Sequence, residues 1–239
     1  MKSTFQSSWI INDAVGIFLG IAVAAGLLSY ESQLLGQPDT ALEKAAGLVF
    51  AIVGGLIAGS ILAWFQWRIL KQRYQHLSWV KWWGNTVLAF IAGWVLAIAP
   101  SFTFTGENSM QAIPPFGIPE FTVVYGSIIF GAILGALIGF AQWLVLRNHQ
   151  DKAAPWIGMN VFSWALSLFV ITLAGLVFQA SNSFREFLLT GVAGGIIAGL
   201  CIAGITSYFF RQADNNNNLK RCWIRIDANP ILKFILNTQ

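Results

Sequence analysis

The feature that most constrains this chain is a series of six long apolar stretches separated by mostly short polar connections. A helix needs roughly 20 mostly apolar residues to cross about 30 Å of hydrocarbon. The chain is 56% hydrophobic and 10% charged, so it lacks the polar residues that cover a soluble domain, which is about a quarter charged. We therefore expect an all-α membrane protein with spans at about 9–29, 45–67, 82–100, 121–146, 156–178 and 187–210.

The first stretch allows a second interpretation, because Asn12 and Asp13 interrupt its start. A cleaved signal peptide has a basic n-region, an apolar segment and a cleavage site of small residues. Lys2 and the residues around 24–26 fit that description. We expect a retained span instead, since the repeat described below needs this segment as a helical partner.

Basic residues lie almost entirely in alternate connections, which predicts the orientation. Lys and Arg are retained on the cytoplasmic side of short loops. Only Lys44 and Arg185 fall in the opposite connections. The other twelve are Lys2, Arg68, Lys71, Arg73, Lys81, Arg147, Lys152, Arg211, Lys220, Arg221, Arg225 and Lys233. Both termini are thus predicted to be cytoplasmic, and the net charge of +4 indicates membrane topology, not nucleic-acid binding.

Two segments outside the predicted spans differ in composition from the other connections. The connection at 101–120 contains three prolines and two glycines, so it does not propagate a helix and is either a lid, a docking site or a plain exterior connector. After the spanning domain at 1–211, residues 212–239 form a predicted cytoplasmic tail. Its Asn215–Asn218 run is expected to be a polar linker, and the apolar and basic residues beyond it suit either an interfacial segment or disorder.

Three of the predicted helices share one pattern of small residues ending in a polar side chain. Helix geometry places steps of four, four and three residues within an arc of roughly 80°, so each pattern forms one narrow face. Small residues on such a face allow close helix packing in lipid. The three copies are Gly55, Gly59, Ala63 and Gln66; Gly131, Gly135, Gly139 and Gln142; and Gly195, Gly199, Ala203 and Thr206.

The other three helices repeat more faintly, each opening with a tryptophan followed by an asparagine. The pairs are Trp9 with Asn12, Trp82 with Asn85, and Trp156 with Asn160. Together the two patterns predict three pseudo-repeated helical hairpins, at about 9–71, 82–147 and 156–211.

A polar side chain on a helix face within hydrocarbon must find a partner, because an unsatisfied polar group there costs several kcal/mol. The asparagines stand at the same predicted depth as the glutamines. We therefore expect an inter-repeat network of Asn12, Gln66, Asn85, Gln142, Asn160 and Thr206, while the tryptophans and the closing Lys or Arg anchor the helices at the interface. This network either holds the bundle together or lines a cavity for a small ligand or a partner helix.

The combination of small-residue spacing with Gln66-Trp67 and Gln142-Trp143, each followed three residues later by leucine, resembles a group of uncharacterised multi-pass membrane proteins common in cyanobacteria and related bacteria. This resemblance covers about half the chain. It implies a bacterial inner membrane, either plasma or thylakoid, and no mechanism. The sixth helix departs from the pattern because Thr206-Ser207 replaces Gln-Trp.

Catalytic and metal-binding groups are scarce in the predicted spans. His76 and His149 both fall in predicted cytoplasmic connections, so no catalytic triad or zinc site assembles at depth. No spaced carboxylates within the spans provide an acid and a base. Cys201 and Cys222 have no metal-ligand spacing and are expected to be structural thiols. We expect no enzyme, metal or cofactor; amide ligation of a chlorophyll magnesium is the weaker alternative.

Two classes of function remain. The first is a non-catalytic accessory, assembly or sensory component that packs against other membrane proteins or a second copy within the bilayer. The second is a small-solute transporter or channel with a pathway between the hairpins. Asp13 is the one ionisable candidate for ion coupling, and its position favours an interfacial or helix-start acid over a proton site. The lack of further buried charge and of helix breaks favours the first class.

Overall fold

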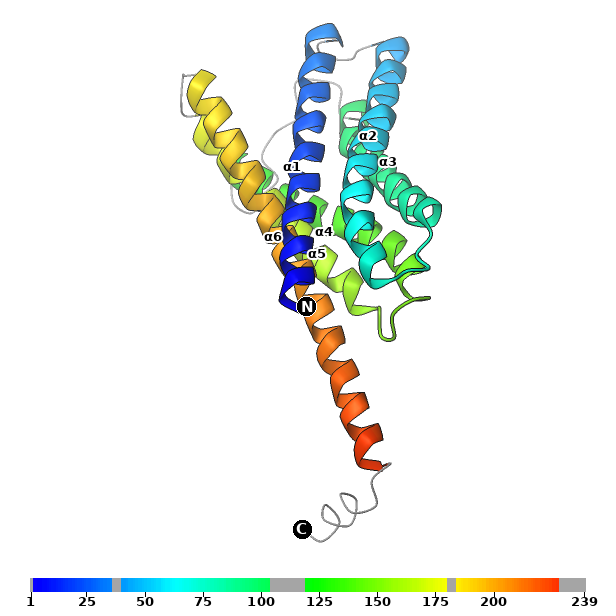
Figure 1. The fold of residues 1–239 in the computed structure, drawn as a ribbon. Coiled ribbons are helices and arrows are strands. Elements are labelled where there is room, and N and C mark those ends of the chain that lie inside the picture. Colours follow the sequence, from blue (N-terminus) through cyan, green and yellow to red (C-terminus); the bar gives the residue numbers. More distant parts are fainter. Residues whose placement is uncertain (1, 36–39, 104–118, 180–183, 228–239) are drawn as a thin grey trace.

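The described part of the chain, residues 2–35, 40–103, 119–179 and 184–227, is all-helical in the computed structural model (Figure 1). Its six helices are α1 (Lys2–Leu35), α2 (Ala41–Arg73), α3 (Trp79–Thr103), α4 (Pro119–Leu146), α5 (Pro155–Gln179) and α6 (Phe184–Asp227). No strand occurs within these ranges. The all-α prediction is therefore confirmed, while most of the connection predicted at 101–120 lies outside the described residues.

Local signals explain where several helices begin and end. Thr40 caps α2: its hydroxyl accepts a hydrogen bond from the Glu43 backbone N–H at 3.2 Å, and the Glu43 carboxylate accepts one from the Thr40 N–H at 2.9 Å. Lys71 and Arg73 lie in the last turn of α2, where the negative end of the helix dipole stabilises cations. α5 begins at Pro155, whose fixed φ suits the first helical position.

Five of the helices contain segments long and apolar enough to cross a membrane: Phe5–Val23, Ala41–Arg73, Val123–Leu146, Pro155–Leu176 and Val192–Asn215. We predicted six. α3 forms a helix where the sixth span was expected, and its described residues are not among these five segments.

The helices are arranged as a closed ring. Each helix contacts its neighbour in the chain, and α6 returns to contact α1. No pair of helices on opposite sides of the ring comes as close, within the described ranges. The centre of the ring is therefore filled by side chains and not by backbone contacts.

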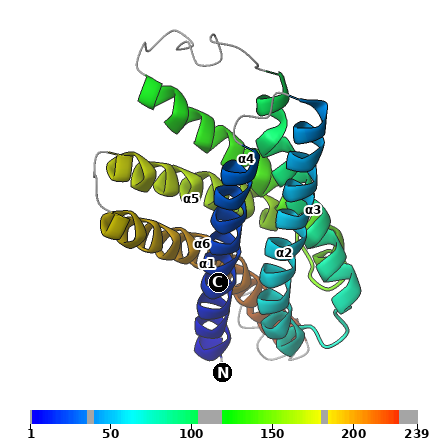
Figure 2. The same cartoon turned by 90° about the horizontal axis from the view of Figure 1, so that it is seen from above.

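Burial is concentrated at one end of this ring. Among the described side chains, burial in α1, α3 and α5 ends near the middle of the helix, at Gly20, Gly93 and Ser167. In α2, α4 and α6 it extends to the last turns of the apolar segment. Figures 1 and 2 show the reason: the helices converge near the start of α1, and the far ends of α1 and α2 diverge from those of α5 and α6. The convergent end holds the core.

Glycines permit the close helix contacts. A Cβ atom built on Gly55 would lie 2.6 Å from the Ile91 Cα of α3, and one on Gly131 would lie 2.6 Å from the Trp164 carbonyl oxygen of α5. On α6, a Cβ on Gly199 would lie 2.9 Å from the Ala14 carbonyl oxygen of α1. Gly135 and Gly139 also face α5 this closely. Cβ atoms on the remaining predicted packing glycines, Gly59 and Gly195, would lie 3.0 Å from Phe90 and 3.1 Å from Phe18.

The predicted linker at Asn215–Asn218 is wrong. α6 continues without a break through these residues to Asp227. Asparagine lowers helix stability by well under 1 kcal/mol per residue, and neither Gly nor Pro stands between Thr206 and Asp227. The run therefore carries no strong stop signal.

Candidate functional site

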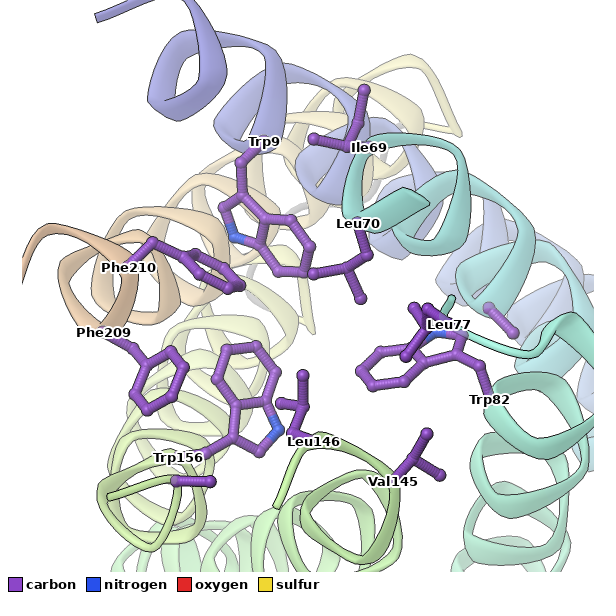
Figure 3. Packing of buried hydrophobic residues seen from close by; sticks show 12 residues of the cluster. Trp9, Ile69, Leu70, Leu77, Trp82, Val145, Leu146, Trp156, Phe209 and Phe210 are labelled. Atoms are coloured by element: carbon purple, nitrogen blue, oxygen red, sulfur yellow. The ribbon is translucent and has the colours of Figure 1, made fainter. Parts of the chain in front are cut away.

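The convergent end of the ring is closed by an apolar cluster that we call the tryptophan layer. It contains Trp9, Trp82 and Trp156, one from each of α1, α3 and α5, and all three are fully buried (Figure 3). The rings of Trp9 and Trp156 pack edge to face with centroids 5.9 Å apart. Phe209 and Phe210 of α6, together with Leu70 and Leu146, complete the layer. We predicted these tryptophans to be interfacial anchors; the structure places them in the core instead.

A second apolar cluster, the inner layer, lies further along the helices. Ile17, Leu62 and Ile138 belong to it, with Phe90 and Ile202. Each stands four residues from a polar side chain, which in turn stands four residues from a member of the tryptophan layer. One helical turn separates residues four apart, so the polar side chains form a level between the two layers. They are Asp13, Gln66, Thr86, Gln142 and Thr206.

These five side chains, joined by the indoles of Trp9 and Trp156, make up what we call the central polar network. Its first branch begins at Trp156, whose indole N–H donates to Gln142 Oε1 at 3.1 Å. Gln142 Nε2 donates to Gln66 Oε1 at 2.8 Å and to Thr86 Oγ1 at 3.2 Å. Gln66 Nε2 donates to Asp13 Oδ1 at 2.8 Å. This branch thus links α5, α4, α3, α2 and α1.

The second branch joins α6 to α1. The Trp9 indole N–H donates to Thr206 Oγ1 at 3.1 Å. Thr206 Oγ1 lies 3.2 Å from Asp13 Oδ2 and 2.8 Å from the Ile202 carbonyl oxygen of its own helix. Both branches therefore end on Asp13, and every helix of the ring contributes a side chain.

The direction of the first branch follows from chemistry. An indole N–H donates and does not accept. Trp156 therefore requires the oxygen of Gln142, which leaves the Gln142 amide nitrogen to donate to Gln66 and Thr86. Gln66 then presents its oxygen to Gln142 and its nitrogen to Asp13. One donor at the end of the branch fixes both amide orientations.

The Trp82 indole does not join the network. Its buried Nε1 has no hydrogen-bond partner among the described residues, although Trp82 occupies on α3 the place that Trp9 and Trp156 occupy on α1 and α5. The side chain from α2 at this level is Gln66, whose oxygen is already bonded to Gln142. The three tryptophans are therefore equally buried and unequally bonded.

The predicted network residues divide into two groups. Gln66, Gln142 and Thr206 come together as described. Asn12, Asn85 and Asn160 instead each donate to the carbonyl oxygen four residues earlier in their own helix, at 2.8–2.9 Å. The expectation that the asparagines pair with the glutamines is therefore corrected. In α1 and α3 the asparagine lies one residue, or about 100°, away from the position that faces the centre.

The residues that sequence analysis missed stand four residues after a tryptophan. This position is Asp13 in α1 and Thr86 in α3. Asp13 was predicted to be an interfacial or helix-start acid, but α1 begins at Lys2 and Asp13 is fully buried. A search at the helical period of about 3.6 residues from the buried tryptophans would have found both side chains.

Polar contacts also connect the helix ends beyond the tryptophan layer. Arg73 of α2 forms a 2.7 Å ion pair with Asp214 of α6. The hydroxyl of Tyr74, which follows α2, donates to Gln150 Oε1 at 3.0 Å. Burial raises the pKa of this tyrosine above its ordinary value, so the hydroxyl remains a donor at neutral pH. The predicted anchors Trp67 and Trp143 lie here, half-buried beneath Lys71 and Arg147.

The central polar network contains few chemically reactive side chains. It offers one carboxyl group, two amides and two hydroxyls, and histidine and cysteine are absent from it. No group of three or more His, Cys, Asp or Glu side chains suited to a metal ion occurs in the part of the chain that the structure describes. What the arrangement can do is join helices and exchange a proton.

These features define an all-helical protein of the membrane, with helices that enclose a buried polar centre. No protein-family model, curated protein or solved structure matches the chain.

Proposed function

We propose that the chain is a non-catalytic polytopic protein of a bacterial inner membrane, either plasma or thylakoid, that packs against other membrane proteins or a second copy of itself. In this role it serves as an accessory, assembly or sensory subunit. One observation carries the proposal: the central polar groups bond to one another, whereas most residues of each spanning segment remain partly or fully exposed. Only 22% to 44% of the residues in each span are buried within the protein.

The outward surface consists of large apolar side chains spread over several helices. Leu88 of α3, Ile129 of α4 and Phe162 of α5 are each more than 60% exposed. Such side chains contact either lipid or another membrane helix, and helix association in lipid relies on packing and hydrogen bonds. The helices also diverge at one end of the ring, which leaves more of their length free to contact a partner.

We propose that all six helices cross the bilayer, α3 included, as three hairpins of one repeated unit. The bonding pattern supports this: Trp9 of the first hairpin bonds to Thr206 of the third, and Trp156 of the third bonds to Gln142 of the second. These two tryptophans thus bond to the second helix of the preceding hairpin, counted around the ring. Trp82 would bond to Gln66 in a strictly threefold protein.

The proposed orientation places both termini in the cytoplasm. Arg68, Lys71 and Arg147 lie over the rings of Trp64, Trp67 and Trp143, at 4.7–5.0 Å from the ring centroids. Aromatic residues stacked with cations are typical of a membrane interface. The distribution of the remaining basic residues supports assigning this interface to the cytoplasmic side.

Purification of the full chain from its native membrane in a mild detergent tests the packing role. We expect a complex larger than the 26.2 kDa chain, with a membrane-protein partner or a second copy in fixed stoichiometry. Separate alanine substitutions at Leu88, Ile129 and Phe162 sample three faces, and at least one should release the partner without lowering the unfolding temperature. Phe209→Ala in the tryptophan layer is the control that should lower that temperature.

A transporter or channel is the second candidate, and Asp13 favours it. Ionisable side chains inside membrane spans commonly belong to transport pathways. Flux measurements in proteoliposomes separate the two roles. A chain that purifies as a monomer and moves a solute, with flux lost in Gln66→Leu, would establish transport and overturn the packing role.

A further inference from the structure

Asp13 is the one fully buried charged residue among the side chains that the structure describes. It lies within the spanning segment Phe5–Val23 of α1, between the tryptophan layer and the inner layer. Transfer of an isolated ionised carboxylate into such surroundings costs many kcal/mol. Asp13 therefore requires a counter-charge, a bound cation or a proton.

No counter-charge reaches Asp13 from the side chains that the structure describes. α1 packs against α2 and α6, and these helices present Gln66 and Thr206 to Asp13. Among the side chains that the structure describes, the charged groups of α2 and α6 nearest to this level lie elsewhere, as does Glu31 of α1 itself. Arg68 and Lys71 lie over tryptophan rings, Arg73 pairs with Asp214, Arg211 is exposed, and Glu31 lies near Gly47 at the opposite end of α1.

A metal cation fits the site poorly. Hard cations take several oxygen ligands. Gln66 turns its amide nitrogen toward Asp13, since its oxygen accepts from Gln142. Apart from the carboxylate itself, Thr206 supplies the one side-chain oxygen bonded to the site. Donors therefore surround the carboxyl group, and a proton is the cation that such a site can accept.

The hydrogen bonds of the network are compatible with both forms of Asp13. Thr206 has one hydroxyl proton and three nearby acceptors: Asp13 Oδ2 at 3.2 Å and the carbonyl oxygens of Ile202 at 2.8 Å and Ala203 at 3.3 Å. With Asp13 ionised, the hydroxyl donates to Oδ2. With Asp13 neutral, Oδ2 carries the proton and donates to Thr206 Oγ1, while the threonine hydroxyl rotates to Ile202.

All other bonds of the network persist in both forms. Gln66 Nε2 donates to Asp13 Oδ1, and the Trp9 indole donates to Thr206 Oγ1. A threonine hydroxyl has one donor and two acceptor sites, so Thr206 stays within its capacity. Rotation of a single O–H bond thus accompanies uptake of one proton.

We propose that Asp13 is a reversible proton-binding site, with the Thr206 hydroxyl as the group that reorients when the proton enters or leaves. The proton comes from water and returns to it, and no other bond is made or broken. The site joins α1 to α6, which is the contact that closes the ring. This inference depends on neither proposed role of the protein.

Infrared difference spectroscopy of the purified full chain in lipid nanodiscs, between acidic and alkaline buffer, tests the proposal. We expect a carbonyl band from a protonated carboxyl group that disappears reversibly in alkali and is missing from Asp13→Asn. This variant keeps an oxygen for Gln66 and places an amide N–H toward Thr206, so it imitates the neutral form. Asp151→Asn, at an exposed position, should retain the band.

A second variant keeps the test decisive if Asp13→Asn does not fold. Thr206→Val removes one partner of the carboxyl group with little change in shape. Hydrogen bonds to charged groups exceed those to neutral ones by about 1 kcal/mol, so the titration midpoint of the band should move to higher pH by about one unit.

Three outcomes would overturn the proposal. The first is a band that is identical in the wild type and in Asp13→Asn. The second is an Asp13 band that persists in alkali, which means a permanently neutral group. In the third, loss of the band follows the sodium concentration at constant pH when choline replaces sodium, which identifies a metal cation as the ligand.

Discussion

At the centre of the protein, the Trp156 indole sets the orientation of Gln142, and Gln142 sets that of Gln66. The same indole ring is also part of the tryptophan layer. One residue therefore contributes apolar packing and a directed hydrogen bond. Trp82 contributes packing alone, because its N–H has no partner among the described residues.

This difference predicts unequal effects of two identical substitutions. Trp156→Phe removes the donor and leaves Gln142 Oε1 unsatisfied, which costs about 1–3 kcal/mol beyond the loss of ring contacts. Trp82→Phe removes an N–H donor that has no acceptor among the described residues, so it should lower the free energy of unfolding by less. Both tryptophans are fully buried, so the difference between their unfolding temperatures in detergent isolates the hydrogen bond. Equal temperatures for the two variants would contradict this assignment.

Gln66, Gln142 and Thr206 were predictable from the sequence because all three end the same small-residue pattern. Asp13 and Thr86 were missed, since the conspicuous asparagines beside them suggested the wrong register. A register error of one residue turns a helical side chain by about 100°. Packing decides which of two adjacent polar residues faces the centre. The sequence of one helix does not specify how that helix packs against a distant segment.

At the scale of the helices, close approach depends on particular glycines. Gly55 and Gly131 have backbone atoms of the adjacent helix where a side chain would be. Gly84 and Gly158 have no atom within 4 Å of the same position. The helices thus contain glycines that packing requires and glycines that it does not.

Alanine substitution should separate the two kinds. Gly55→Ala and Gly131→Ala should destabilise the protein by about 1–3 kcal/mol through overpacking. The matched variants Gly84→Ala and Gly158→Ala should be neutral or slightly stabilising, because alanine favours helix over glycine by up to about 1 kcal/mol. Thermal unfolding in one detergent measures all four. A larger loss at Gly84 than at Gly55 would show that the α2–α3 contact is misplaced.

The sequence predicted each helix but not its full length. α1 and α2 extend beyond the expected spans at both ends, and α6 continues through four asparagines. Hydropathy marks where a helix lies in lipid and says nothing about its continuation into water. Capping signals decide the latter, as Thr40 does for α2.

For the molecule as a whole, the proposed orientation can be tested by cysteine labelling. Gln33 follows the first span, Gln75 follows the second, and both are exposed. In a background with Cys201→Ser and Cys222→Ser, a membrane-impermeant maleimide should label Gln33→Cys in intact cells. It should label Gln75→Cys only after permeabilisation. The reverse pattern would place the termini outside.

The closed ring is the property that the sequence did not predict. Contact between α1 and α6 joins segments nearly 200 residues apart, and no repeat in the sequence specifies it. The central polar network makes that closure specific, since Asp13 bonds to α2 and α6 at once. The central claim is therefore that the six helices are coupled through this network.

A double-mutant cycle on Gln66 and Gln142 tests that claim most directly, because α2 and α4 are not neighbours in the ring and their side chains meet at its centre. Unfolding free energies would be measured for Gln66→Leu, Gln142→Leu and the double variant, with exposed Gln72→Leu paired to Gln142→Leu as the control cycle. We predict a coupling energy of about 0.5–3 kcal/mol for the central pair and additivity for the control. Additive effects of Gln66→Leu and Gln142→Leu would contradict the network.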